Sequence, residues 1–140
     1  MTKKGFTFFQ NDDVIIAKIT PSMENGKGAY VENMKNNLGF GSTEFHTIRA
    51  ISNEAIGKYI HYLLKQKEFR INASKNMTGT SGHKRVPKEY VEDYKFLMPD
   101  IKIQKKIIKE IEKIEDDIVK LQNENEQLKI DKENVLKKYL

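Results

Sequence analysis

Short apolar runs separated by turn residues open the chain and predict a small sheet. Asp13 to Ile19 is a β-branched apolar run, which indicates a buried strand. Pro21 ends this run, and Asn25–Gly28 has the composition of a turn. We therefore expect Ala29 to Asn33 to return as a second strand.

The next segment predicts a loop, a strand and a helix in that order. Asparagine and glycine residues between positions 36 and 41 are typical of a loop, and Thr43 to Ile51 partly alternate as a strand does. Ser52 or Asn53 is placed to cap a helix. That helix is predicted from one apolar stripe at three- and four-residue spacing, formed by Ile56, Tyr59, Ile60, Leu63 and Leu64.

The last elements are a polar loop, a short strand and a long helix. Met77 to Val86 is rich in small polar residues and basic at its end, and Tyr94 to Met98 are predicted as a strand. Pro99 and Asp100 then open the helix, with Asp100 as its cap. The expected architecture is an α/β (α+β) domain over residues 1–99, followed by one coiled-coil helix over residues 100–140.

A heptad repeat runs along this C-terminal helix and predicts a coiled coil. The d positions are Ile107, Ile114, Leu121, Leu128 and Val135, and the a positions are Ile111, Ile118, Asn125, Lys132 and Tyr139. A single helix would leave this seam in water, so a partner helix is required. A parallel homodimer would oppose Glu110 and Glu115, and we therefore expect an antiparallel homodimer.

Charge locates a candidate binding surface. The net charge is +5, and the tract from Lys58 to Lys88 holds eight basic residues against Glu68 alone, which gives +7. Such an excess attracts a polyanion by counterion release, although a basic face without a partner is the alternative. The chain has no cysteine and no apolar run long enough for a bilayer, and its N-terminus lacks a signal-peptide core. We expect a cytoplasmic protein.

Catalytic chemistry is not predicted for this chain. It has no glycine-rich phosphate loop and no serine nucleophile elbow, and His46, His61 and His83 do not have metal-ligand spacing. Two Asp-x-Lys triplets, at Asp93 and Asp100, are expected by chance in so charged a sequence. No catalytic residue, metal site or directly bound cofactor is therefore expected.

Three polar segments are better suited to binding DNA. Glycines flank Lys27, which lets one cation and bare backbone approach a phosphate. The other two segments combine hydroxyls, cations and an acceptor, the mixture that base edges require. They contain Ser42, Thr43, Glu44 and His46, and then Thr78, Thr80, Ser81, Lys84 and Arg85. The alternative is that these segments are tight turns whose polar groups satisfy their own backbone.

Three motifs followed by the heptad helix resemble the specificity subunit of type I restriction-modification systems. The motifs are Ile-Thr-Pro-Ser-Met-Glu-Asn-Gly-Lys-Gly (19–28), Gly-Phe-Gly-Ser-Thr-Glu-Phe (39–45) and Met-Thr-Gly-Thr-Ser-Gly-x-x-Arg-Val-Pro (77–87). The resemblance runs from about Phe6 to the C-terminus and keeps the order and spacing of these features. It implies a target recognition domain that recognises half of a split double-stranded DNA site, joined to a spacer helix that pairs with a second spacer.

The resemblance also implies partners. Modification (methyltransferase) subunits bind S-adenosylmethionine, and restriction subunits complete the complex, so this chain would be its non-catalytic component. A full specificity subunit has two recognition domains and two spacers, whereas this chain holds at most one of each. We expect its recognition domain to lack a front portion, because the first strand of the resemblance begins almost at Met1. Half-length family members that form homodimers are similar to what the heptad requires, which is a partner helix.

Two other functions fit the same residues. One is a dimerisation adaptor whose basic body binds nothing, although an adaptor does not require +7 in one tract. The other is the recognition end of a fused restriction-methylation enzyme, with catalysis on another segment.

Overall fold

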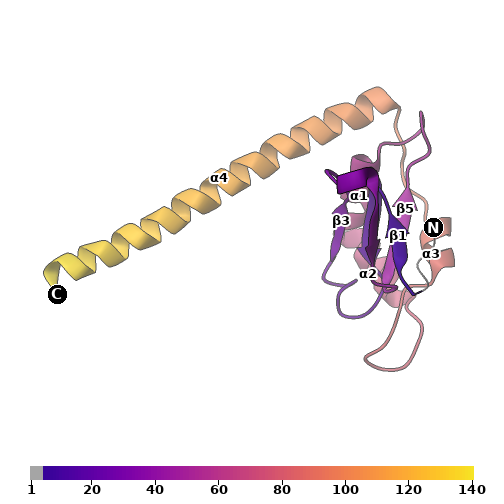
Figure 1. Ribbon diagram of the computed structural model, residues 1–140, viewed down its shortest axis with the longest axis horizontal. Coiled ribbons are helices and arrows are strands. Elements are labelled where there is room, and N and C mark those ends of the chain that lie inside the picture. The colour runs from indigo at the N-terminus through magenta and orange to yellow at the C-terminus, as the bar shows by residue number, and fades with distance from the viewer. Residues whose placement is uncertain (1–4) are drawn as a thin grey trace. The chain divides into compact units, whose positions relative to one another are not determined.

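The computed structural model describes residues 5–140 (Figure 1). The chain divides into two compact units, residues 1–105 and residues 106–140. Two small sheets and three helices belong to the first unit, and a long C-terminal helix continues through the second. This mixture of sheets and helices confirms the predicted α+β class. The functional boundary expected between residues 99 and 100 stays a prediction.

A three-stranded antiparallel sheet is the centre of the first unit. Strand β2 (Asp13–Ala17) lies between β3 (Gly28–Tyr30) and β5 (Phe45–Arg49). Four of the five β2 residues are buried, as expected for a central strand with β-branched side chains. All three strands were predicted, and each is shorter than expected.

A two-stranded ribbon forms the second sheet and corrects the prediction for residues 36–41. Strand β1 (Thr7–Phe9) pairs antiparallel with β4 (Gly39–Gly41), and a 3-10 turn, η1 (Lys35–Asn37), precedes β4. Gly39 was taken as a loop residue. It lies in β4 opposite Phe9, and a Cβ there would come within 2.3 Å of the Phe9 ring, so packing requires glycine.

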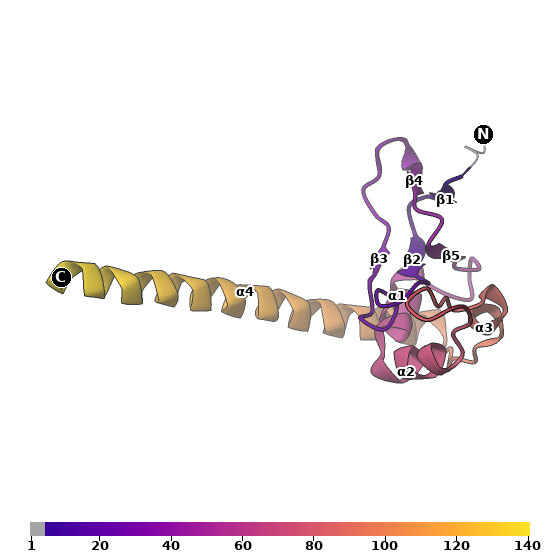
Figure 2. The same ribbon diagram turned by 90° about the horizontal axis from the view of Figure 1, so that it is seen from below.

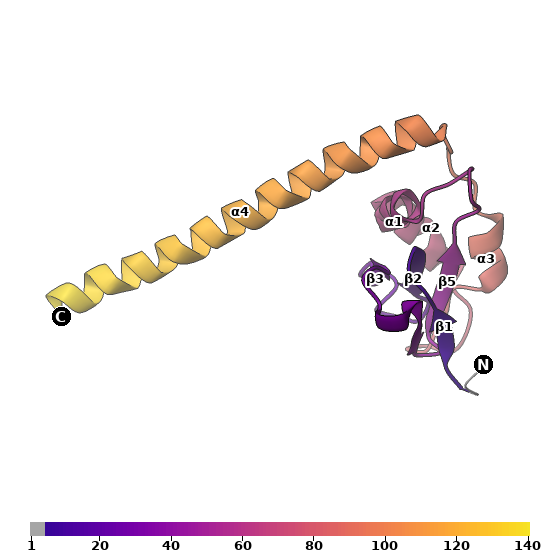
Figure 3. The same ribbon diagram turned by 45° about the horizontal axis from the view of Figure 1, so that its top comes forward.

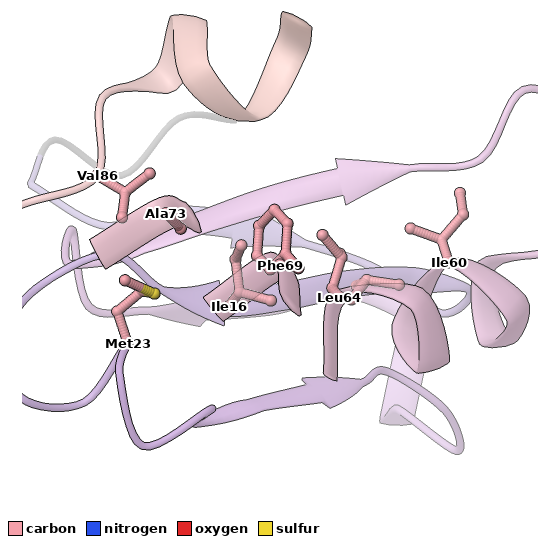
Figure 4. Close-up of a cluster of buried hydrophobic side chains, with 8 residues drawn as sticks. Ile16, Met23, Ile60, Leu64, Phe69, Ala73 and Val86 are labelled. Carbon is pink, nitrogen blue, oxygen red and sulfur yellow. The ribbon is translucent and has the colours of Figure 1, made fainter. Parts of the chain in front are cut away.

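Helices α1 (Gly57–Lys65) and α2 (Lys67–Lys75) lie together on one side of the strands (Figure 3). The predicted apolar stripe of α1 is confirmed, since Tyr59, Ile60, Leu63 and Leu64 are buried. Figure 4 shows the resulting core, where side chains of β2, α1 and α2 meet. Its buried members are Val14, Ile16, Met23, Ile60, Leu64, Phe69, Ala73 and Val86.

The start of α1 is held by a distant glutamine and not by the predicted cap. Ser52 and Asn53 lie in a turn before the helix, and the residue at the cap position, Ile56, makes no side-chain cap bond. The Ile56 N–H donates instead to Oε1 of Gln104 at 2.9 Å. Gln104 is fully buried, and its Nε2 also donates to the carbonyls of Glu54 and Pro99. Every polar atom of this amide is therefore used to join two segments of the unit.

Residues after the polar loop also differ from expectation. Helix α3 (Lys88–Asp93) was not predicted, and the strand predicted at Tyr94–Met98 is wrong, because this segment pairs with no strand of the described chain. The Tyr94 and Phe96 rings pack on Phe69, with centroids 5.0 and 5.9 Å away. The alternating aromatic pattern thus serves a ring cluster and not a sheet.

Helix α4 (Ile101–Tyr139) begins as the sequence predicts, because the Ile103 N–H donates to Oδ1 of Asp100 at 3.0 Å. Within residues 106–140 much of the heptad seam is open to water. Ile114, Leu121 and Leu128 are 58%, 62% and 66% exposed. None of the helices over residues 5–140 has the length and apolar character needed to cross a membrane.

Candidate functional site

The segment Lys18–Thr20, directly after β2, connects two of the three predicted binding segments. The Lys18 N–H donates to the carbonyl of Glu44 at 2.9 Å, where β5 begins. The Lys18 carbonyl accepts from Val86 at 2.8 Å, and the Thr20 N–H donates to Lys84 at 2.9 Å. One short stretch of backbone therefore brings residues 44 and 84–86 to the same end of the sheet.

The third segment begins at Ile19 and ends at the same place. The chain from Pro21 returns to β3 through Lys27, whose carbonyl accepts the Ala17 N–H at 2.9 Å. Gly26, inside this turn, has φ +67°, a left-handed conformation that glycine adopts without steric cost. All three polar segments thus meet at the end of the sheet where β2 finishes and β3 and β5 begin, at the lower edge of the body in Figure 1.

The loop between Thr78 and Arg85 is a hairpin anchored at its base. Thr78 and Arg85 exchange both backbone hydrogen bonds, at 2.9 and 2.8 Å. The His83 N–H donates to the Thr80 carbonyl at 2.9 Å, which closes a turn at the tip. Figure 2 views the body from below and therefore looks toward this loop. At the base of the loop Arg85 pairs with Thr78, and its neighbours Lys84 and Val86 bond to the Lys18–Thr20 segment. Residues 78–84 are exposed.

Glu44 and Arg85, predicted in different binding segments, form a bidentate ion pair. The Arg85 Nε donates to Oε2 of Glu44 at 2.8 Å, and Nη2 donates to Oε1 at 2.7 Å. The hydrogen bond from Arg85 lowers the pKa of Glu44, and the same bond raises the pKa of Arg85. Both side chains are only partly buried, at 32% and 41% exposed. The pair therefore lies at the surface of the predicted site.

His46 lies underneath the loop. Its Nε2 is 2.8 Å from the Val86 carbonyl, and because a carbonyl only accepts, this nitrogen carries the proton. The ring is half-buried, and burial lowers the pKa of His46 below the ordinary value of 6.5. The imidazole predicted to contact DNA thus has its Nε2–H engaged within the fold; DNA contact by this residue stays a prediction.

The remaining predicted residues are exposed. Lys27 and Lys84 have no hydrogen-bond or ion-pair partner for their side-chain nitrogens among residues 5–140. The Ser42 hydroxyl accepts from the Glu44 N–H at 3.1 Å, as in a local turn. The other hydroxyl residues, Thr43, Thr78, Thr80 and Ser81, are all exposed at the same end of the unit.

The sequence over residues 1–130 matches the family described as "Type I restriction modification DNA specificity domain". The chain belongs to this family. Two relatives from Escherichia coli are similar over 106 residues, the EcoAI specificity subunit at 41% identity and the EcoEI specificity subunit at 38%. Each similarity covers 76% of this chain and 18% of the relative. The chain therefore corresponds to a small part of these relatives, and the resemblance found in the three motifs is confirmed.

Within this specificity-domain chain, not every cation of the +7 tract is available. Arg70 donates to the Glu24 carbonyl at 3.2 Å and packs against Gly26, where a Cβ would come within 2.9 Å of it. Lys88 pairs with Glu92 at 2.6 Å on α3. Arg70 therefore supports the turn that carries Lys27, whereas Lys88 forms an exposed ion pair within α3. Among the described residues, no group of three or more histidine, cysteine and acidic side chains is placed to hold a metal ion.

Lys18 is the residue that sequence patterns missed. It was included in the buried strand, yet it lies after β2, is only half-buried and acts electrostatically on both Glu44 and His46. The signal was a single cation at the end of an otherwise apolar run. Its place in the site depends on backbone pairing with residues far along the chain, which periodicity does not reveal.

The position of His46 predicts how stability depends on pH. Because its folded-state pKa is depressed, the unfolded chain binds more protons between that pKa and about 6.5. The free energy of unfolding should therefore fall as the pH drops from about 6.5 toward the folded-state pKa. His46→Gln keeps an N–H donor near Nε2 without titrating, and should remove part of this decline in a series of thermal melts. His83→Gln, at an exposed loop position, is the control and should melt like the wild type at each pH; an unchanged decline in His46→Gln would contradict the assignment.

Proposed function

We propose that this chain recognises a specific sequence in double-stranded DNA as the non-catalytic specificity component of a type I restriction-modification complex. One observation carries the proposal: in a member of the DNA specificity family, three polar segments gather at one end of a sheet. Exposed cations and hydroxyls are the groups that contact phosphates and base edges. The names of the Escherichia coli relatives support the same role.

The proposed contacts divide by chemistry. Lys27 and Lys84 have exposed ammonium groups, which suit phosphates. Hydroxyls can serve either backbone or bases. The residues proposed for this second role are Ser42, Thr43, Thr78, Thr80 and Ser81, with Glu44, His46 and Arg85 completing the interface.

Other components would supply the chemistry of the complex. We propose that methyltransferase subunits bind S-adenosylmethionine and that restriction subunits cleave DNA, while this chain binds neither cofactor nor metal. The support is that the two Escherichia coli relatives are specificity subunits of restriction enzymes. The exposed seam of α4 within residues 106–140 gives the second part of the role, which is to pair with another helix.

We propose that the helix partner is a second copy of this chain in antiparallel orientation. The seam residues are Ile107, Ile111, Ile114, Ile118, Leu121, Asn125, Leu128 and Val135. Their Ile and Leu side chains gain from burial at about 25 cal/mol per Å² of apolar surface removed from water. Asn125 at an a position favours one register at a cost in stability. Antiparallel pairing avoids placing Glu110 against Glu115.

The DNA-binding role is tested by salt dependence. Lys27→Ala combined with Lys84→Ala removes two phosphate contacts and should weaken binding to all duplexes. The slope of log affinity against log salt should become flatter by about 1–2 units, because each neutralised phosphate contributes roughly 0.9. Fluorescence anisotropy over a salt series measures this slope.

The matched control removes the same charge elsewhere. Lys113→Ala combined with Lys120→Ala changes two exposed residues on α4, outside the seam, and should leave the slope unchanged. An equal effect of both pairs would show attraction by net charge alone. If the wild-type chain binds no duplex, the dimerisation adaptor becomes the better account.

Self-association is tested separately. Replacing Ile114 and Leu121 together with Asp places charges in the seam, so light scattering should report a monomer for the variant and a dimer for the wild type. Val119 and Ile130 are exposed outside the a and d positions, and their replacement by Asp is the matched control. An unchanged dimer mass in the Ile114 and Leu121 variant would exclude the seam as the interface.

A further inference from the structure

Three hydrogen bonds hold the Arg85 guanidinium in place. Two bonds to Glu44 hold Nε and Nη2, and Nη1 donates to the carbonyl of His83 at 2.9 Å. The Arg85 backbone is held as well, by the paired hydrogen bonds with Thr78. A long side chain that is normally mobile is therefore positioned before any ligand arrives, which reduces the entropy lost on binding.

The remaining N–H donors of Arg85 can bind a group outside the protein. A guanidinium has five N–H groups, and the three bonds described use one each on Nε, Nη1 and Nη2. One N–H is left on Nη1 and one on Nη2, the two nitrogens at the outer end of the group. The side chain is 41% exposed. Two adjacent donors of this kind match the N7 and O6 acceptors of guanine in the major groove.

The Glu44 carboxylate is engaged by Arg85, whereas the sequence had suggested a contact with a base edge. Both carboxylate oxygens accept from Arg85, at 2.8 and 2.7 Å, so the carboxylate is directed at the arginine. A glutamate that accepts from cytosine would instead need to direct an oxygen at the base. Charge-assisted bidentate bonds are among the strongest orienting contacts that a side chain makes.

We propose that Arg85 contacts a guanine of the target through Nη1 and Nη2, and that Glu44 is the positioning residue that holds the guanidinium for this contact. The proposal deepens the proposed DNA-recognition function and rests on it. Neighbouring Lys84 provides the contrast, because its ammonium has no partner among the described residues. The two adjacent cations therefore differ: Lys84 contributes affinity for any duplex, and Arg85 contributes preference for one base pair.

The test is binding selection of the full chain on a library of randomised duplexes, compared among single and double variants. Arg85→Lys keeps the charge but loses the two-donor guanidinium. The preference for guanine at one base pair should fall by on the order of tenfold or more. Glu44→Gln should lose preference at that same base pair. The double variant should lose no more than Arg85→Lys alone, because the two residues act as one unit. Lys84→Gln is the control and should weaken binding to every duplex without changing the selected sequence.

Three outcomes would overturn the proposal. Glu44→Gln could lose preference at a different base pair, which would indicate direct base contact by Glu44, or it could leave the selected sequence unchanged. A wild-type chain that selects no sequence would refute the proposed function, and the inference with it. Glu44→Asp keeps the charge on a shorter side chain and should show an intermediate loss at the same guanine.

Discussion

The candidate site depends on one set of backbone hydrogen bonds, those between Lys18–Thr20 and the segments around Glu44 and Lys84–Val86. These bonds extend the pairing of β2 beyond its last strand residue and bring together parts of the chain about 25 and 65 residues apart. Backbone groups that pair in this way are seldom left unsatisfied when buried, so the arrangement is costly to open. Side-chain contacts follow from it: His46 reaches Val86, and Glu44 reaches Arg85. These backbone hydrogen bonds thus hold the polar loops in place.

Patterns within about ten residues of sequence predicted much of the fold. Strand β2 follows from its β-branched run, α1 from its apolar stripe, and the start of α4 from the Asp100 cap. The features that the sequence did not predict depend on contacts between residues far apart in the chain. The Ile56 N–H is satisfied by Gln104, which lies 48 residues away, and no cap signal near α1 reveals this. Strands β1 and β4 are three residues each and gain their identity only from pairing with each other.

The sequence named the residues of the candidate site but not their contacts with one another, and DNA binding by these residues stays a prediction. The three motifs named the polar side chains that the structure gathers at one end of the sheet, because loop composition is a local property. Net charge treated all cations of the tract alike, whereas Arg70, Arg85 and Lys88 are engaged within the fold and Lys84 is not. The same total charge therefore includes cations in structural contacts, a guanidinium held by hydrogen bonds and an exposed lysine. Only the three-dimensional arrangement distinguishes these roles, because a residue such as Glu44 lies 41 positions from its partner Arg85.

The central claim is that DNA binds at the end of the sheet where the three polar loops meet. Titration of the isotopically labelled chain with duplex DNA, followed by amide chemical shifts in NMR spectra, tests this claim directly. The account predicts that the largest shifts fall on Lys27, on Ser42 to Glu44 and on the hairpin between Thr78 and Arg85. Shifts concentrated instead on the exposed lysines of α1 and α2, such as Lys65, Lys67 and Lys75, with the three loops unaffected, would contradict it.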